Sequence, residues 1–281
     1  MKSLTYLDGE WQEGNPPVLG PATLATWLGS VIFDGARSFE GTAPDLDRHC
    51  QRACASAEKM GMKSPVSAEE IERLAREGIA KFPADTALYI KPLMLAEDGW
   101  IYPDPATTRF MLHIFESPLP EPKGFSAHIS SRRRPAPDQA PTDAKAAALY
   151  PNAGRALREA NEAGFDNAIM LDPVGNVAEF ATSNVFMAKD GLVKTPVPNG
   201  TFLNGITRQR IIKLLREDGV SVEEATVTPK DLREADEIWS TGNHAKVTPL
   251  SRFEDREMQP GPMAARCREL YWGFAKKNAA L

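Results

Sequence analysis

A proline-rich break divides the sequence near its middle. Residues 116–124 read ESPLPEPKG, with three prolines in nine residues. Proline fixes its own φ angle and has no backbone N–H, so this stretch suits neither a helix interior nor a central strand. We therefore predict a linker at residues 119–123, between a first domain at 1–118 and a second domain at 124–281. Each domain is long enough to bury a core of its own.

The first predicted domain carries signals for both helices and strands. Ser67 followed by Glu70 is a capping-box pattern, and apolar residues then recur at helical spacing. A further helix is predicted over residues 47–59. Short runs at 87–94 and 109–115 have the composition of strands. This mixture predicts an α+β domain.

The second predicted domain is richer in strands than in helices. Residues 167–171 and 177–181 flank a turn-rich segment, which predicts a hairpin. Another strand is predicted at 184–188, and a short apolar strand at 237–240. A helix is predicted over 207–218, where a glycine follows the last periodic residue. This domain is therefore also expected to be α+β.

Composition excludes several classes of protein. The 281 residues include 33 Lys and Arg against 38 Asp and Glu, a net charge of −5. Such mild acidity gives no reason to expect nucleic acid or an anionic membrane as a partner. No apolar run approaches the ~20 residues that span a bilayer. The cysteines and histidines lack metal-ligand spacing, so we expect no metal and a cytoplasmic enzyme or binding protein.

Lys145 is the first candidate for chemistry. It lies in DAKAAALY, a helix-forming run that begins near Ala144, with four alanines within four positions of the lysine. Packing among small side chains would lower the pKa of the amine and make it a better nucleophile towards a carbonyl. On composition alone, a solvated helical lysine is the commoner outcome of this pattern.

Two later segments carry further candidate groups. Glu179 ends a strand-like run, where alternation would direct its carboxylate inward and require a cationic partner, although a surface glutamate is commoner there. Residues 203–208 form a tight turn that enters a helix. The N–H groups of Ile206 and Thr207 would lie at the helix N-terminus, a place that binds phosphate readily. An ordinary helix cap also explains this turn.

The order and spacing of these segments resemble the class IV pyridoxal-phosphate aminotransferases, the branched-chain aminotransferase family, over nearly the whole chain. EFATSNVF at 179–186 is similar to the family's E-G-x-x-x-N-[ILV]-F, and NGITR at 204–208 is similar to P-G-I-T-R. Upstream, FDGAR at 33–37 resembles F-E-G-x-R, and HCQR at 49–52 resembles H-x-x-R. Because these motifs occur together and in the family's order, they indicate membership.

The resemblance implies roles for named residues toward a pyridoxal 5'-phosphate cofactor. Lys145 would be the Schiff-base lysine that holds the cofactor and moves the proton. Glu179 would pair with the pyridine nitrogen, and Tyr150 would lie against the cofactor. The other implied cofactor-binding residues are Arg52, Asn184, Ile206, Thr207 and Asn243.

The resemblance also implies a set of substrate-binding residues. YIKP at 89–92 resembles the family's Y-x-R-P, so Lys91 stands where an arginine is common. Lysine keeps the positive charge but loses the two-pronged guanidinium, so a carboxylate-bearing substrate is still favoured. The implied substrate-binding residues are Phe33, Arg37, Tyr89, Lys91 and His244.

Two segments depart from the family pattern. TGNH at 241–244 stands in the position of S-G-T-A, so Asn243 and His244 replace threonine and alanine. The amide of Asn243 can still donate a hydrogen bond, whereas His244 adds bulk and a titratable ring. The family's G-N-Y after the lysine is ALY at 148–150 here. We expect phosphate and substrate-carboxylate binding to differ from the family accordingly.

The implied architecture is a two-domain α+β enzyme of fold type IV, with the cofactor in the cleft between the domains and a homodimer as the assembly. The implied reaction is amino transfer between a branched-chain or similar apolar L-amino acid and 2-oxoglutarate. The same fold hosts (R)-selective amine and D-amino-acid transaminases, aminodeoxychorismate lyases and silent cofactor-binding relatives, so these alternatives stay open.

Two other features are expected to be structural. His113 lies in an apolar run and is predicted to be a core or interface histidine. The run Arg132–Arg134 is predicted to be a solvated edge, although Arg134 coincides with an arginine often seen in the family.

Overall fold

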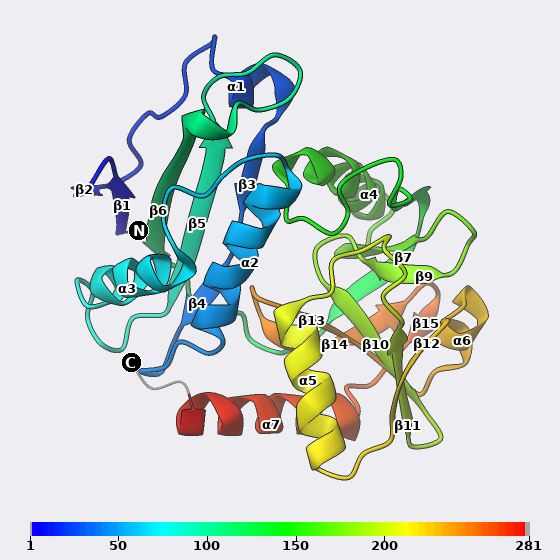
Figure 1. The fold of residues 1–281 in the computed structure, drawn as a ribbon. Coiled ribbons are helices and arrows are strands. Elements are labelled where there is room, and N and C mark those ends of the chain that lie inside the picture. The colour runs from blue at the N-terminus through cyan, green and yellow to red at the C-terminus, as the bar shows by residue number, and fades with distance from the viewer. Residues whose placement is uncertain (1, 279–281) are drawn as a thin grey trace. The chain divides into compact units, whose positions relative to one another are not determined.

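The computed structural model describes residues 2–278, and its elements are labelled in Figure 1. The described chain divides into two compact units, with a boundary between Leu119 and Pro120. The partition differs from the expected one, because residues 144–149 and the described residues from Ala275 onward belong to the first unit. The reason for the first exception is backbone pairing, since Ala146 forms a β-bridge with Ile32.

The first unit is built on an antiparallel sheet with the strand order β2-β1-β6-β5-β3, and β4 also pairs with β5. The central strands β5 and β6 are the longest, and they confirm the strands predicted from composition. The strands are β1 Ser3–Leu7, β2 Glu10–Glu13, β3 Val31–Phe33, β4 Ala36–Ser38, β5 Leu88–Ala96 and β6 Thr108–Glu116.

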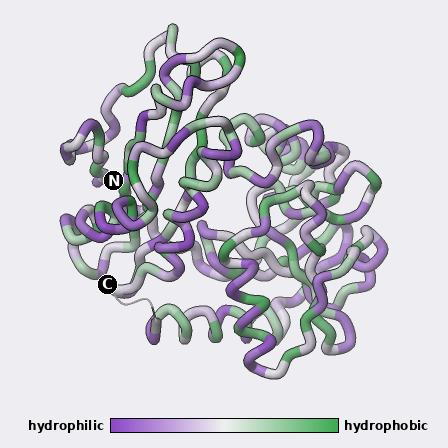
Figure 2. Tube along the Cα trace, viewed as in Figure 1, coloured by the Kyte–Doolittle hydropathy of each residue, from purple (hydrophilic) through white to green (hydrophobic). Residues whose placement is uncertain are grey.

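Helices α2 (Leu46–Lys59) and α3 (Ala68–Ile79) pack on this sheet and enclose the apolar core of the first unit. Both helices are confirmed. Ser67 caps α3 as predicted, because its hydroxyl accepts the N–H of Glu70 at 3.2 Å. Figure 2 shows α3 mostly in the purple of hydrophilic residues, as expected for a helix that buries one stripe only. The shorter helices are α1 Leu24–Leu28 and the 3₁₀ helices η1 Pro105–Thr107 and η2 Ala147–Leu149.

The other face of this sheet carries a different set of side chains. Along β5, alternate residues such as Leu88 and Ile90 are buried in the core, while Tyr89 and Lys91 are only partly buried. The register pairs Lys91 with His113 on β6. Directly opposite residues project from the same face, so aromatic and basic groups gather there.

The second unit is built on a mixed sheet with the strand order β12-β11-β10-β13-β14-β7-β8-β9, and β15 pairs with β14. The predicted hairpin is confirmed, because β8 and β9 pair antiparallel. The strands are β7 Phe125–Arg133, β8 Asn167–Leu171, β9 Val177–Phe180, β10 Asn184–Lys189, β11 Leu192–Pro196, β12 Val222–Ala225, β13 Glu237–Gly242, β14 Lys246–Phe253 and β15 Arg256–Glu257.

Four α-helices are described after the linker: α4 Tyr150–Glu162, α5 Ile206–Glu217, α6 Pro229–Glu234 and α7 Pro262–Asn278. The helix predicted at 207–218 is thus confirmed. The helix-forming run predicted from Ala144 is wrong in its start, since α4 begins only at Tyr150. Residues 144–146 are not helical, because their backbone is bound to β3 and α2, as described below.

No helix within residues 2–278 is both long enough and apolar enough to cross a membrane.

Candidate active site

Lys145 lies outside any helix or strand, in a segment whose backbone is hydrogen-bonded on both sides of the residue. Its carbonyl accepts the N–H of Phe33 at 3.2 Å, and its own N–H donates to Ser56 Oγ on α2 at 3.1 Å. The ammonium nitrogen lies 4.9 Å from the centroid of the Phe33 ring, and the side chain is partly buried. The solvated helical lysine is therefore not what the chain forms. The structure holds this amine at a defined place beside an aromatic ring.

Asp34, which follows Phe33, is fully buried and binds two basic side chains. It accepts from Arg52 Nε at 2.6 Å and Nη2 at 2.8 Å, and from His49 Nδ1 at 2.7 Å. Because a carboxylate only accepts, His49 carries a proton on Nδ1. Burial alone would raise the pKa of Asp34, but the charge and hydrogen bonds of Arg52 and His49 hold it well below its usual value. This triad fixes Arg52 through two of its nitrogens and leaves Nη1 outside the pair.

Arg37, on β4, is fully buried and is bound to the segment that leaves the first unit. Its Nη1 and Nη2 donate to the hydroxyl and the carbonyl of Ser117, each at 2.7 Å. Burial lowers its pKa to about 10. The guanidinium also lies 5.8 Å from the centroid of Tyr89. Arg37 and Tyr89 are paired across β4 and β5, so the fixed guanidinium helps to hold the ring in place.

Lys91 stands among aromatic rings on the same sheet face. Its Nζ lies 5.2 Å from the centroid of Phe115 and 5.8 Å from that of Tyr89. Burial lowers the pKa of Lys91, and burial together with the Lys91 charge lowers the pKa of His113. His113 Nδ1 is 2.8 Å from Thr5 Oγ1, so this histidine is packed into the sheet as expected.

In the second unit, Glu179 on β9 is buried and points inward. Its Oε1 lies 3.3 Å from Arg134 Nε, and its Oε2 accepts Asn184 Nδ2 at 3.1 Å. The prediction of a solvated edge is wrong for Arg134, which is buried and also donates to the carbonyl of Thr201 at 3.0 Å. A buried carboxylate needs a cation and hydrogen bonds, and Arg134 meets that need. Its coincidence with the family arginine was the available sequence signal.

Asn184 connects Glu179 to the turn before α5. Its Oδ1 accepts the N–H of Gly205 at 3.1 Å, and its Nδ2 donates to the carbonyl of Leu203 at 2.9 Å. A Cβ at position 205 would lie 2.1 Å from Asn184 Oδ1, so this close approach requires glycine. Gly205 has no side chain to cap the helix. The N–H groups of Ile206 and Thr207, the first two residues of α5, therefore suit an anion.

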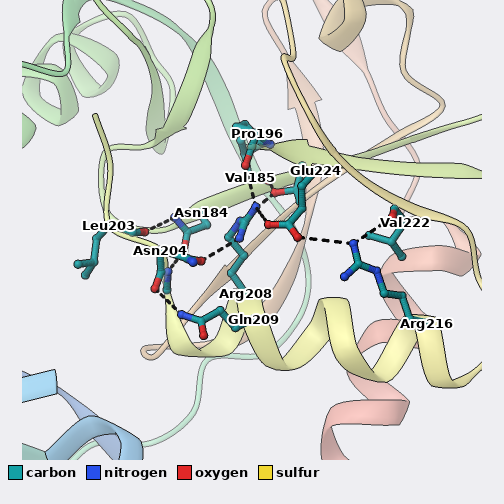
Figure 3. A network of polar contacts seen from close by, with 12 residues as sticks. Asn184, Val185, Pro196, Leu203, Asn204, Arg208, Gln209, Arg216, Val222 and Glu224 are labelled. Atoms are coloured by element: carbon teal, nitrogen blue, oxygen red, sulfur yellow. Dashed lines mark hydrogen bonds and ion pairs between the residues drawn. The ribbon is translucent and has the colours of Figure 1, made fainter. Parts of the chain in front are cut away.

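Arg208 anchors the start of α5 to the neighbouring strands (Figure 3). Its Nη1 donates to Asn204 Oδ1 at 2.8 Å, and its Nη2 donates to the carbonyl of Pro196 at 2.7 Å and to Glu224 at 3.0 Å. The side chain is almost wholly buried. The arginine of the NGITR segment thus holds the turn in shape, while the N–H groups of the helix start stay available.

The turn after β13 presents buried polar atoms. Thr241 pairs with Asn184 across β13 and β10, so both side chains lie on the same sheet face. Among the described residues, Thr241 Oγ1 and Asn243 Nδ2 are buried and have no hydrogen-bond partner. Such atoms are costly unless something binds them. Of the other expected residues, Tyr150 is 41% exposed at the start of α4, and His244 is exposed.

Known proteins with similar sequences identify the family of this chain. Residues 31–253 match the family model "Amino-transferase class IV". The chain belongs to the class IV aminotransferases. It is 32% identical over 262 residues to a probable branched-chain-amino-acid aminotransferase of Aquifex aeolicus, covering 88% of this chain and 84% of that protein. It is also 32% identical over 286 residues to the branched-chain-amino-acid aminotransferase of Pseudomonas aeruginosa, covering 95% and 91%.

Solved structures place the fold of this aminotransferase in the same family. An aminotransferase from Brucella abortus, bound to the cofactor PLP, is 54% identical with a TM-score of 0.97, covering 98% of this chain and 100% of that one. The branched-chain aminotransferase of Escherichia coli is 28% identical with a TM-score of 0.92, covering 99% and 96%. The expected α+β fold of type IV is confirmed.

The predicted site residues of this aminotransferase fall into two groups. Lys145 shares the first unit with Phe33, Arg37, Arg52, Tyr89 and Lys91, whereas the second unit holds Tyr150, Glu179, Asn184, Ile206, Thr207, Asn243 and His244. Sequence reasoning did not single out Asp34 or Thr241, and it assigned Arg134 to the surface. No group of three or more His, Cys, Asp or Glu suited to a metal occurs within residues 2–278.

Proposed function

We propose that the chain is a pyridoxal-phosphate-dependent transaminase that moves an amino group between a branched-chain or similar apolar L-amino acid and 2-oxoglutarate. The observation that carries this proposal is the network from Glu179 through Asn184 to Gly205. It joins a buried carboxylate to an open helix N-terminus. Those are the partners that the ring nitrogen and the phosphate of this cofactor require, at opposite ends of one molecule.

Each unit carries residues that we assign to the cofactor. When bound, pyridoxal phosphate supplies an electron-withdrawing ring for the electrons released at the substrate Cα. Glu179 would keep a proton on the ring nitrogen, with Arg134 and Asn184 holding the carboxylate in place. Arg52, Asn243 and the N–H groups of Ile206 and Thr207 would donate to the phosphate, and Tyr150 would lie against the cofactor. The PLP-bound relative from Brucella abortus, at 54% identity, supports this assignment.

Lys145 would be the catalytic residue. Its amine would hold the cofactor covalently, and as the free amine it would accept and return the proton at the substrate Cα. The segment is fixed by Phe33 and Ser56, so the side chain alone has to move between these tasks. Such a fixed base is what proton transfer at one carbon needs.

The proposed substrate wall combines apolar rings with one cation. Phe33 and Tyr89 provide apolar surface, and Lys91 provides the charge for the second carboxylate of 2-oxoglutarate. Arg37 would act by placing Tyr89, and His244 would lie at the edge of the wall. The names of the relatives from Aquifex aeolicus and Pseudomonas aeruginosa support a branched-chain donor.

The test is a visible absorbance spectrum of the purified protein with added pyridoxal phosphate, recorded in parallel with L-leucine and with (R)-1-phenylethylamine. We expect the band of the lysine-bound cofactor to disappear with L-leucine only. Loss with the (R)-amine alone would instead favour an (R)-selective amine transaminase. A protein that never forms the band would contradict both enzymatic assignments.

The Lys145→Ala variant tests the catalytic residue. It should lose the lysine-bound band and transamination, whereas Lys123→Ala, in the exposed linker, should keep both. Transamination by Lys145→Ala at the wild-type rate would show that the assignment is wrong.

We also propose a homodimer in the cytoplasm. Cys50, Cys54 and Cys267 carry free thiols, which suits a reducing compartment. The loop residues Trp100, Ile101 and Tyr102 are each 74% exposed in the single chain. A run of exposed large apolar side chains is typical of a protein interface, and a second copy of this chain is the partner that the family resemblance implies.

A further inference from the structure

Lys246 is a lysine in an unusual position. It is the first residue of β14, directly after the turn that contains Asn243, and only 1% of its surface is exposed. Its backbone has φ = +62°, a left-handed conformation that residues other than glycine seldom adopt. An ammonium is costly to bury unless it is bound to polar or aromatic groups. Its Nζ lies 2.8 Å from Asn243 Oδ1 and 5.5 Å from the ring centroid of Tyr271 on α7.

This contact determines how the Asn243 amide is oriented. An ammonium has only donors, so the amide must turn its oxygen toward Lys246. Because the amide group is planar, its nitrogen then faces away from the lysine. That nitrogen, Nδ2, is buried and has no hydrogen-bond partner among the described residues. Two N–H donors are therefore presented to whatever occupies the site.

The substitution of asparagine for the family's threonine explains why an orienting group is needed. A hydroxyl rotates and can both donate and accept, so it adapts to its ligand without help. An amide has one donor end and one acceptor end. If it turned over, it would present its oxygen to an anion, and the partial negative charge of that oxygen would repel the anion.

We propose that Lys246 is a positioning residue that fixes the Asn243 amide so that its N–H groups bind an anionic oxygen in the site. The oxygen belongs either to the cofactor phosphate or to the substrate carboxylate. This inference rests on the proposed function, because it assigns that site an anionic ligand. It adds a residue outside the motif segments, which acts through Asn243 without touching the ligand.

A double-mutant cycle on the full-length protein tests the proposal. The variants are Asn243→Ala, Lys246→Met and the two combined, and the dissociation constant of pyridoxal phosphate from the cofactor-free protein is measured by fluorescence titration. Pyridoxal, which lacks the phosphate, and the KM for L-leucine are measured in parallel. We expect each single variant to lower the affinity for the same ligand about tenfold. The combined variant should bind that ligand no more weakly than Asn243→Ala does.

The parallel measurements identify the anion. If the variants bind pyridoxal phosphate more weakly but bind pyridoxal as the wild type does, the anion is the cofactor phosphate. If instead the KM for L-leucine rises while the cofactor affinity is unchanged, the anion is the substrate carboxylate. If Lys246→Met weakens the ligand equally when Asn243 is already alanine, the lysine acts on the anion directly and the proposal is wrong. Wild-type affinity for every ligand in the Lys246→Met variant would also overturn it.

A second pair of variants tests the proposal if Lys246→Met does not fold. Asn243→Asp keeps an oxygen for Lys246 but replaces the donors with a carboxylate, so it should fold and bind the anion more weakly than Asn243→Ala. Lys246→Arg keeps a donor for the amide and should restore most of the affinity. Anion affinity in Asn243→Asp equal to that of the wild type would contradict the proposal. The proposed function itself is judged separately, by the wild-type response to L-leucine.

Discussion

At the scale of single residues, the charged groups inside the first unit are held in place by one another. Asp34 is the centre of this arrangement, because Arg52 and His49 both donate to it. Breaking such a pair from one side leaves a buried cation without its partner, which costs more than an exposed ion pair is worth. The carboxylate therefore supports both the local fold and the orientation of Arg52.

The first prediction concerns Asp34→Asn. At pH 7 this variant should lose about 3–5 kcal/mol in the free energy of unfolding, measured in urea by tryptophan fluorescence. The pKa of Asp34 is lower in the folded protein than in the unfolded chain, so its stabilisation is present at neutral pH and is lost as the pH falls below about 4. The variant has no such group and should lose less stability over that range. Asp85→Asn, at an exposed turn, is the control and should behave as the wild type.

The second prediction concerns Gly35, which lies against Tyr89. A Cβ at this position would lie 2.2 Å from Tyr89 Oη and 2.7 Å from Cζ, so Gly35→Ala must displace the ring. We expect a loss of about 1–3 kcal/mol in stability and a rise of about tenfold in the KM for the amino donor. Gly154→Ala, in α4 with nothing near its Cβ, should gain about 0.5–1 kcal/mol and keep its KM. An unchanged KM in Gly35→Ala would remove Tyr89 from the proposed substrate wall.

At the scale of elements, the starts of the helices differ in how their N–H groups are satisfied. Helix α3 uses the hydroxyl of Ser67, and α6 uses a reciprocal capping box between Thr228 and Asp231. Helix α7 uses a carboxylate from another element, since Glu237 on β13 accepts the N–H groups of Met263 and Ala264. Helix α5 begins after Gly205 without a side-chain cap, and α1 and α2 also begin without one. The start of α5 differs from these two in that Asn184 holds the preceding glycine through its N–H.

The third prediction tests the start of α7. Glu237→Ala removes an acceptor that lies 3.1 Å from the N–H groups of Met263 and Ala264, and it removes a negative charge from a helix N-terminus. The expected loss is about 1–2 kcal/mol in the free energy of unfolding. Glu223→Ala, on the exposed side of β12, should stay within about 0.5 kcal/mol of the wild type. Equal losses in the two variants would show that the cap contributes nothing specific.

At the scale of the whole molecule, the exposed loop 100–102 is the feature that a single chain leaves unexplained. One chain has a mass of 30.8 kDa. We predict that the wild type is a dimer, with twice that mass in analytical ultracentrifugation. Replacing Trp100, Ile101 and Tyr102 with serine should shift the protein to the mass of one chain in analytical ultracentrifugation. Val174→Ser, which removes an 82% exposed apolar side chain from another turn, should leave the dimer intact. A wild-type monomer would contradict the proposed assembly.

Much of the fold and part of the candidate site could be predicted from the sequence alone. The caps, periodicities and turns of α3, α5 and the β8–β9 hairpin are properties of neighbouring residues, so local patterns were sufficient. The same holds for Ile206 and Thr207, whose N–H groups lie at a helix start because the preceding turn contains glycine.

The sequence by itself determined which elements form and which residue types are available to the site. The tertiary structure alone decided that Lys145 is not helical, that Arg134 is buried beside Glu179, and that Lys246 is bound to Asn243. These outcomes depend on contacts such as Arg134 with Thr201, which are 67 positions apart in the chain. Local propensity favoured a helix at Lys145 and solvent at Arg134. The energies of backbone pairing and of neutralising a buried carboxylate were larger, and they exist only once the chain has folded.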